Sequence, residues 1–187
     1  MFIQTEPTPN PATLKFLPGR QVMPAGTADF TSPEAAEPSP LAARLFGVSG
    51  VTGVFLGADF VTITKAEGED WQILKPMILG AIMEHYTSGA PVMTGATTAG
   101  PGGAEDGGED DDEIVVQIKE LIDTRVRPVV ARDGGDIVFR GFRDGVVYLH
   151  MQGSCSGCPS STMTLKNGIE NMLRHFVPEV RLVEAVN

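Results

Sequence analysis

The chain of 187 residues contains two cysteines, Cys155 and Cys158, within the stretch Gly153-Ser-Cys-Ser-Gly-Cys-Pro-Ser-Ser-Thr162. Cysteine pairs at this spacing hold zinc or one edge of an iron–sulfur cluster, and each such site takes four ligands. Two thiolates per chain therefore fill half of a sulfur-only site. The other half has to come from a second copy of the chain or from a partner protein.

The residues around the pair suit an anionic centre. Cys158 stands immediately before Pro159, which is typical of the first position of a helix, and the helix dipole there favours a thiolate. Gly153 and Gly157 let the backbone approach closely, and the neighbouring serines add small hydrogen-bond donors. We expect this loop to be exposed and to chelate one metal ion or one edge of a cluster.

Three interpretations of the pair remain open from the residues alone. A thiol–disulfide oxidoreductase of thioredoxin type is disfavoured, because only 29 residues follow Cys158 and the proline lies after the pair. The second is a zinc half-site shared by a dimer and stabilising an interaction module. The third is a 4Fe–4S cluster bridged between two chains. Spacing does not separate zinc from iron.

Other candidate ligands are weaker. His150 precedes the pair by five residues, and strand alternation favours a packing or surface role for it. His85 and His175 lie near predicted helix ends, where the helix dipole explains them. Asp133-Gly-Gly-Asp136 is better interpreted as a turn than as a calcium loop. No Ser/His/Asp arrangement or phosphate-binding glycine loop is present, so we expect a protein that is not an enzyme.

Charge is distributed unevenly along the chain, whose formal net charge is −10. Residues 1–104 carry a net charge of −4, residues 105–112 hold six acidic and no basic side chains, and residues 113–187 are neutral. Because no basic surplus is available to neutralise phosphates, we expect no binding to nucleic acid.

The start of the sequence has neither the apolar region of a signal peptide nor the arginine-rich character of a transit peptide. No apolar run approaches the length of about 20 residues that spans a bilayer. We therefore expect no membrane association and a cytoplasmic location, where a close cysteine pair is more often metal-binding or redox-active than structural.

The pattern predicts α+β architecture in two small α+β domains, residues 1–87 and 113–187. A flexible, acidic, glycine-rich linker is expected at 88–112, where large apolar residues are scarce. The first domain is predicted to hold four strands and two helices. Their expected ranges are Met1–Thr5, Ala12–Leu17, Val51–Leu56 and Phe60–Thr64 for the strands, with helices after the caps Ser39 and Asp70; a polar, proline-containing stretch precedes Ser39.

The second domain is predicted to begin with a helix, Ile114–Val126, that Pro128 ends. A hairpin follows across Arg143-Asp-Gly145, and then come the cysteine loop, a helix from Pro159 and a last strand. The expected strands are Ile137–Phe142, Val146–Met151 and Val180–Val186.

Residues 126–179 resemble the C-terminal domain shared by the Nfu and NifU iron–sulfur proteins. The likeness is carried by Arg127-Pro-Val-Val-Ala-Arg-Asp-Gly-Gly-Asp136, by the cysteine stretch, and by Leu165-Lys-Asn-Gly-Ile-Glu170. The opening Gln4-Thr-Glu-Pro-Thr-Pro-Asn-Pro-Ala-Thr-Leu-Lys-Phe16 is similar to the N-terminal domain of Nfu proteins. The additional cysteine-containing domains of NifU have no counterpart here, so the chain resembles the Nfu branch, and we expect a bacterial, cytoplasmic member.

The resemblance implies an iron–sulfur cluster scaffold and carrier. In this family two chains form a homodimer around a 4Fe–4S cluster, and the positions that match the cluster ligands are Cys155 and Cys158. The cluster is received from an upstream scaffold that acts as donor and passed to apo iron–sulfur proteins as acceptors.

Overall fold

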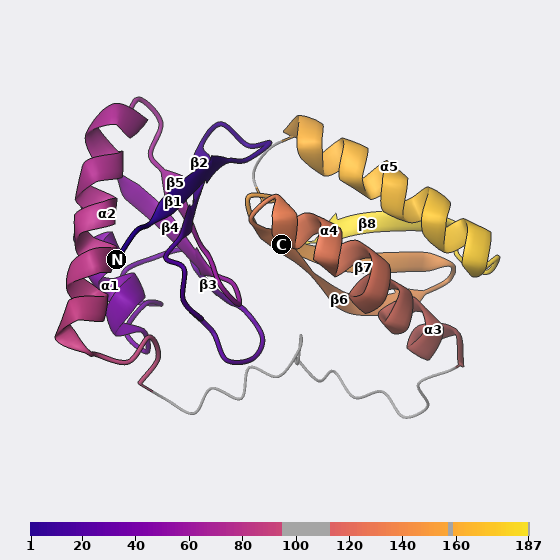
Figure 1. Cartoon of the computed structure of the whole chain (residues 1–187). Coiled ribbons are helices and arrows are strands. Elements are labelled where there is room, and N and C mark those ends of the chain that lie inside the picture. The colour runs from indigo at the N-terminus through magenta and orange to yellow at the C-terminus, as the bar shows by residue number, and fades with distance from the viewer. Residues whose placement is uncertain (95–112, 157–158, 187) are drawn as a thin grey trace. The chain divides into compact units, whose positions relative to one another are not determined.

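The computed structural model of the chain describes residues 1–94, 113–156 and 159–186. The chain divides into two compact units, Met1–Pro101 and Gly102–Asn187, and each combines helices with one β-sheet (Figure 1). The expected α+β class with two small domains is confirmed. Most of the expected linker, residues 95–112 with the acidic run 105–112, lies outside the described residues. No helix in the described ranges is long and apolar enough to cross a membrane.

The first unit is built on an antiparallel five-stranded sheet in the order β1-β2-β5-β4-β3. Two helices, α1 and α2, cover one face of this sheet (Figure 1). The elements are β1 (Gln4–Pro7), β2 (Thr13–Leu17), β3 (Ala28–Phe30), α1 (Pro40–Phe46), β4 (Val51–Leu56), β5 (Val61–Lys65) and α2 (Trp71–Ser88). The sequence predicted all of them except the edge strand β3, which lies in the polar stretch before Ser39.

Both helices begin where the sequence predicted. The hydroxyl of Ser39 accepts a hydrogen bond from the backbone N–H of Ala42 at 3.1 Å, and the carboxylate of Asp70 accepts one from Gln72 at 2.8 Å. These bonds satisfy N–H groups that have no partner within the helix. Helix α2 ends at Gly89, whose φ of 71° is the left-handed conformation that glycine adopts without strain.

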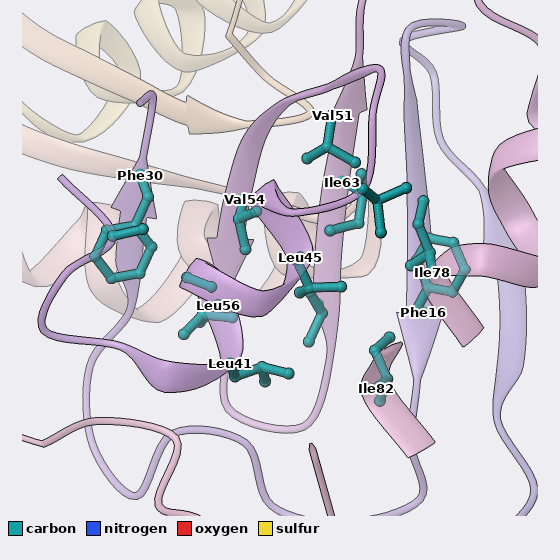
Figure 2. Close-up of a cluster of buried hydrophobic side chains, with 14 of the residues drawn as sticks. Phe16, Phe30, Leu41, Leu45, Val51, Val54, Leu56, Ile63, Ile78 and Ile82 are labelled. Carbon is teal, nitrogen blue, oxygen red and sulfur yellow. The ribbon is translucent and has the colours of Figure 1, made fainter. Parts of the chain in front are cut away.

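The core of the first unit lies between the sheet and the two helices. Side chains from the strands meet those from α1 and α2 in one cluster (Figure 2). Its fully buried members shown there are Phe16, Leu41, Leu45, Leu56, Ile63, Ile78 and Ile82. Each such side chain contributes about 1.5–3 kcal/mol relative to an exposed one, so this cluster stabilises the unit independently of the cysteine loop.

Residues 89–94, which follow α2, are bonded to the start of α1 and pack against the core of the first unit. The hydroxyl of Ser39 donates a hydrogen bond to the carbonyl of Val92 at 2.6 Å, and the N–H of Thr94 donates to the carbonyl of Pro38 at 2.8 Å. Val92 and Met93 also pack against the core of this unit. Ser39 therefore serves both as the cap of α1 and as an attachment point for residues 89–94.

The second unit has a three-stranded sheet in the order β6-β7-β8. β6 (Gly135–Arg143) and β7 (Val146–Gly153) form the expected antiparallel hairpin, with Asp144 and Gly145 at positive φ in its turn. α5 (Pro159–Phe176) then crosses over to β8 (Leu182–Val186), which pairs in parallel with β7. The cysteine loop is the connection between β7 and α5.

The N-terminal helix of the second unit runs further than the sequence predicted. α3 (Glu113–Leu121) continues through a π-helical turn, η1 (Ile122–Val126), into α4 (Arg127–Arg132). The prediction that Pro128 ends the helix was wrong. In the wider turn the N–H of Arg127 bonds to the carbonyl of Ile122, and Pro128, which has no N–H, occupies the start of α4, where none is needed.

The first testable prediction concerns Ser39. Replacing Ser39 by Ala removes the α1 cap and the bond to Val92, so we expect the free energy of unfolding of the first unit to fall by about 1–3 kcal/mol. Trp71 is the single tryptophan and lies in this unit, so its fluorescence during urea denaturation reports the change. The control is Ser32→Ala, whose exposed hydroxyl accepts one bond from Ala35. Equal losses in the two variants would contradict the role given to Ser39.

Candidate metal centre

The cysteine loop begins where β7 ends. Gly153, the last residue of β7, has a φ of 63°, and its carbonyl accepts a hydrogen bond from the N–H of Ser156 at 3.1 Å. The hydroxyl of Thr162, in the first turn of α5, donates to the carbonyl of Cys155 at 3.1 Å. The backbone on either side of Cys155 is therefore tied to the strand before it and to the helix after it.

A second set of contacts ties the loop to the turn that precedes β6. The N–H of Ser154 donates to the carbonyl of Gly134 at 3.3 Å, and the hydroxyl of Ser154 donates to the carbonyl of Asp133. Asp133 and Gly134 in turn donate their N–H groups to the carbonyls of Val130 and Ala131 at the end of α4. The interpretation as a turn is confirmed for Asp133 and Gly134, whereas Gly135 and Asp136 already belong to β6. The turn also supports the cysteine loop through these hydrogen bonds.

Gly135 lies close to the candidate ligand Cys155. A Cβ atom at this position would lie 2.5 Å from the Sγ atom of Cys155 and 2.8 Å from the carbonyl oxygen of Gln152. Real Cβ atoms essentially never approach other atoms so closely. In the hairpin register Gly135 pairs with Gly153, so two glycines face one another at the base of the loop. Cys155 occupies space that any larger residue at 135 would fill.

The next residue, Asp136, forms a buried ion pair. Its two carboxylate oxygens accept hydrogen bonds from Nε and Nη2 of Arg127 at 2.9 and 2.8 Å, and one of them also accepts from the N–H of Ile137. The side chain of Asp136 is 5% exposed. Arg127 also contacts Asp123, which is 55% exposed. The bidentate ion pair between Arg127 and Asp136 joins the start of α4 to the start of β6.

The thiol of Cys155 is buried, with 7% of the residue exposed, so the expectation of an exposed loop was wrong at this residue. The pKa of the Cys155 thiol is raised from 9.0 to about 11, chiefly because burial disfavours the thiolate. The carboxylates of Asp133 and Asp136 add to the rise, and a hydrogen bond with Ser154 opposes it. Without metal, the thiol of Cys155 is therefore protonated and neutral at pH 7.

Cys158, the second candidate ligand, lies outside the described residues, as does the thiolate expected there at the start of the helix. Among the described residues no group of three His, Cys, Asp or Glu side chains could hold a metal ion. A ring nitrogen of His150 lies 3.1 Å from the carbonyl of Val186 in β8, which agrees with a packing role. Within that part of the chain, Cys155 is the cysteine that can serve as a ligand.

The other two histidines lie elsewhere in the fold. His175 stacks edge-on against Phe176 at the end of α5. His85 is fully buried in the first unit, and burial followed by the nearby Arg44 lowers its pKa. A neutral His85 gains little from the helix dipole, so its position is better explained by packing than by the interaction that the sequence suggested.

Sequence reasoning missed the supporting role of Gly135, Asp136 and Arg127. The first two were assigned to a turn, and Arg127 was not singled out for any role of its own. The available signal was a pair of adjacent glycines next to an acid, 20 residues before Cys155. This signal points to a contact with the cysteine loop only once the hairpin register is known, because the register places Gly135 opposite Gly153.

Comparison with known proteins identifies the family. The model for the N-terminal domain of Nfu/NifU scaffold proteins matches residues 3–89, and the NifU-like domain model matches residues 118–184. The human protein "NFU1 iron-sulfur cluster scaffold homolog, mitochondrial" is 54% identical over 187 residues, which are all of this chain and 72% of that protein. The chain belongs to the Nfu/NifU scaffold protein family. The resemblance expected from the sequence motifs is thus confirmed.

One further relative and one solved structure are also similar to this chain, over all and half of its length respectively. The protein of the same name from Drosophila erecta is 57% identical over 187 residues, and this chain spans 65% of its length. A solution structure of a NifU-like protein from Saccharomyces cerevisiae is 28% identical, covers 50% of this chain and 85% of its own, and superimposes with a TM-score of 0.46.

The expected cytoplasmic location was wrong, because the similar Nfu proteins from human and fruit flies are named as mitochondrial. The expectation rested on the first residues of the sequence, where no targeting segment was found. The first residues of a sequence are by themselves a weak guide to the location of a protein. The relatives point to the mitochondrion.

The raised pKa of Cys155 yields a second prediction. In the variant Cys158→Ser, Cys155 is the single thiol. At pH 8 iodoacetamide should alkylate it at least about a hundredfold more slowly in the folded than in the urea-unfolded chain, because the raised pKa lowers the thiolate fraction by about that factor and burial restricts access further. Since deprotonation supplies the reactive form, the folded-state rate should increase about tenfold per pH unit between pH 7 and 9.5. A rate that levels off below pH 9 would contradict the neutral thiol.

Proposed function

We propose that the protein is a carrier that binds a 4Fe–4S cluster between two chains through Cys155 and Cys158 and transfers it to apo-proteins. The observation that carries the proposal is the cysteine count. Each chain has two cysteines, and a 4Fe–4S cluster held by thiolates takes four. A homodimer supplies that number with one Cys-x-x-Cys pair from each chain.

Family membership supports the choice of iron–sulfur over zinc. The similar proteins from human and Drosophila are named iron-sulfur cluster scaffold homologs, and both units of this chain match models of scaffold or NifU-like domains. Their mitochondrial location makes mitochondrial apo iron–sulfur proteins the acceptors that we propose, with an upstream cluster scaffold as the donor.

Cluster transfer in this proposal is an exchange of thiolate ligands. Each iron–sulfur bond to Cys155 that breaks is replaced by a bond to an acceptor thiolate. Because the pKa of Cys155 in the empty site is about 11, this sulfur takes up a proton on release, and the acceptor thiol gives one up. The proton count balances, and no electron is gained or lost. Such an exchange requires no catalytic acid or base, so we propose a carrier and not an enzyme.

Anaerobic reconstitution tests the proposal. Incubation of the full chain with ferrous iron and sulfide should yield a dimer with about four iron atoms, since four thiolates complete one cluster. Mössbauer spectroscopy identifies the 4Fe–4S type, and size-exclusion chromatography with light scattering measures the dimer. The control is the same chain incubated with iron but no sulfide. A monomer that binds zinc tightly and assembles no cluster would falsify the proposal.

Single substitutions test the assigned ligands. Cys155→Ser or Cys158→Ser leaves two thiolates in place of four in a homodimer, so each variant should lose stable cluster binding. The control is Ser156→Ala, which changes an exposed residue between the two cysteines. Iron and sulfide contents after reconstitution measure the loss, and circular dichroism verifies the fold. A cluster of normal absorbance in either cysteine variant would show that other residues hold it.

A further inference from the structure

The glycine at position 135 is required for space and not for backbone conformation. Its neighbour Gly134 has a φ of 80°, whereas Gly135 is not among the residues with positive φ. The backbone of Gly135 therefore lacks the left-handed φ that favours glycine, yet a Cβ there would overlap the Sγ of Cys155 at 2.5 Å and approach its backbone nitrogen to 3.1 Å. The absence of a side chain at 135 lets Cys155 lie against the backbone at the start of β6.

The start of β6 is held from the helical side by Arg127. Both oxygens of Asp136 bond to the guanidinium of Arg127, and the pair is largely excluded from solvent. Arg127 follows the π-helical turn Ile122–Val126 directly. The position of the Arg127 backbone therefore depends on this irregular turn. Buried ion pairs seldom stabilise a fold more than apolar residues of similar size do, whereas their directional bonds do define geometry.

We propose that Gly135 and the Arg127–Asp136 ion pair position Cys155 for ligation. Gly135 supplies the space for Sγ, and the ion pair holds Gly135 in place through the adjoining residue. None of the three residues is a ligand. The proposal deepens the proposed function and rests on it for its purpose, because it names the residues that orient one cluster thiolate. The geometry itself belongs to the empty protein and can be tested without a cluster.

The test measures alkylation of Cys155 by iodoacetamide in the full chain carrying Cys158→Ser, at fixed pH and temperature. Adding Gly135→Ala should move Sγ out of its place against β6 and raise the alkylation rate on the order of tenfold, since access to the thiol limits a buried cysteine. The matched control is Gly141→Ala in the same strand, where a Cβ meets nothing within 4 Å. Its rate should stay within about twofold of the parent.

The charge-conserving variant Arg127→Lys tests the ion pair separately. It also tests the positioning of Cys155 if Gly135→Ala fails to fold. Arg127→Lys keeps the positive charge near Asp136 and loses the two-pronged bond, so Cys155 should become several-fold more reactive. The control is Arg125→Lys, an exposed position in the π-helical turn. Circular dichroism in urea gives the unfolded population of each variant. If Gly135 and the ion pair only stabilise the fold, each substitution would raise the alkylation rate only in proportion to the unfolded population of the variant.

Reconstitution with Cys158 intact completes the experiment. Gly135→Ala and Arg127→Lys should both bind less cluster than the two controls. Alkylation rates of Gly135→Ala and Arg127→Lys that match those of their controls overturn the positioning role, even when the unsubstituted chain forms a normal cluster. If the unsubstituted chain forms no cluster and the thiol rates still rise as expected, the proposed function fails and the positioning of Cys155 stands.

Discussion

The contact between Gly135 and the sulfur of Cys155 is the constraint on which the second unit depends. It exists only if β6 and β7 pair with Gly135 opposite Gly153, and a shift of one residue would turn the side chains of β6 to the opposite face. The ion pair from Arg127 holds one side of the contact, and the hydroxyl of Thr162 holds the carbonyl of Cys155 on the other. Helix, hairpin and loop therefore converge on one sulfur atom.

Local rules predicted much of the fold. Ser39 and Asp70 begin helices because their side-chain oxygens accept bonds from unpaired N–H groups, and this preference is visible in a few residues of sequence. The turn at Arg143-Asp-Gly145 follows in the same way from residues that accept positive φ. Cys155 and Cys158 were chosen from the chemistry of closely spaced thiols, and their role as ligands stays a prediction.

The remaining features follow from one local irregularity of the helix and from contacts between residues distant in sequence. The rule that proline ends a helix failed at Pro128 because a π-helical turn places it at the start of a new segment. The burial of Cys155 was also missed, since the small polar residues around it suggest an exposed loop. Cys155 belongs to the buried core of the second unit, and Gly135, 20 residues earlier, leaves room for its sulfur; sequence spacing alone does not show that the two residues approach one another.

The neutral, buried thiol of Cys155 also bears on how an empty subunit withstands oxidants. Peroxides attack the thiolate and convert it to sulfenic acid, and further oxidation is irreversible. A thiol that keeps its proton up to a pH of about 11 presents little of the reactive form at physiological pH. In the carrier that we propose, the surroundings of Cys155 would therefore slow oxidation of this sulfur while the site is empty.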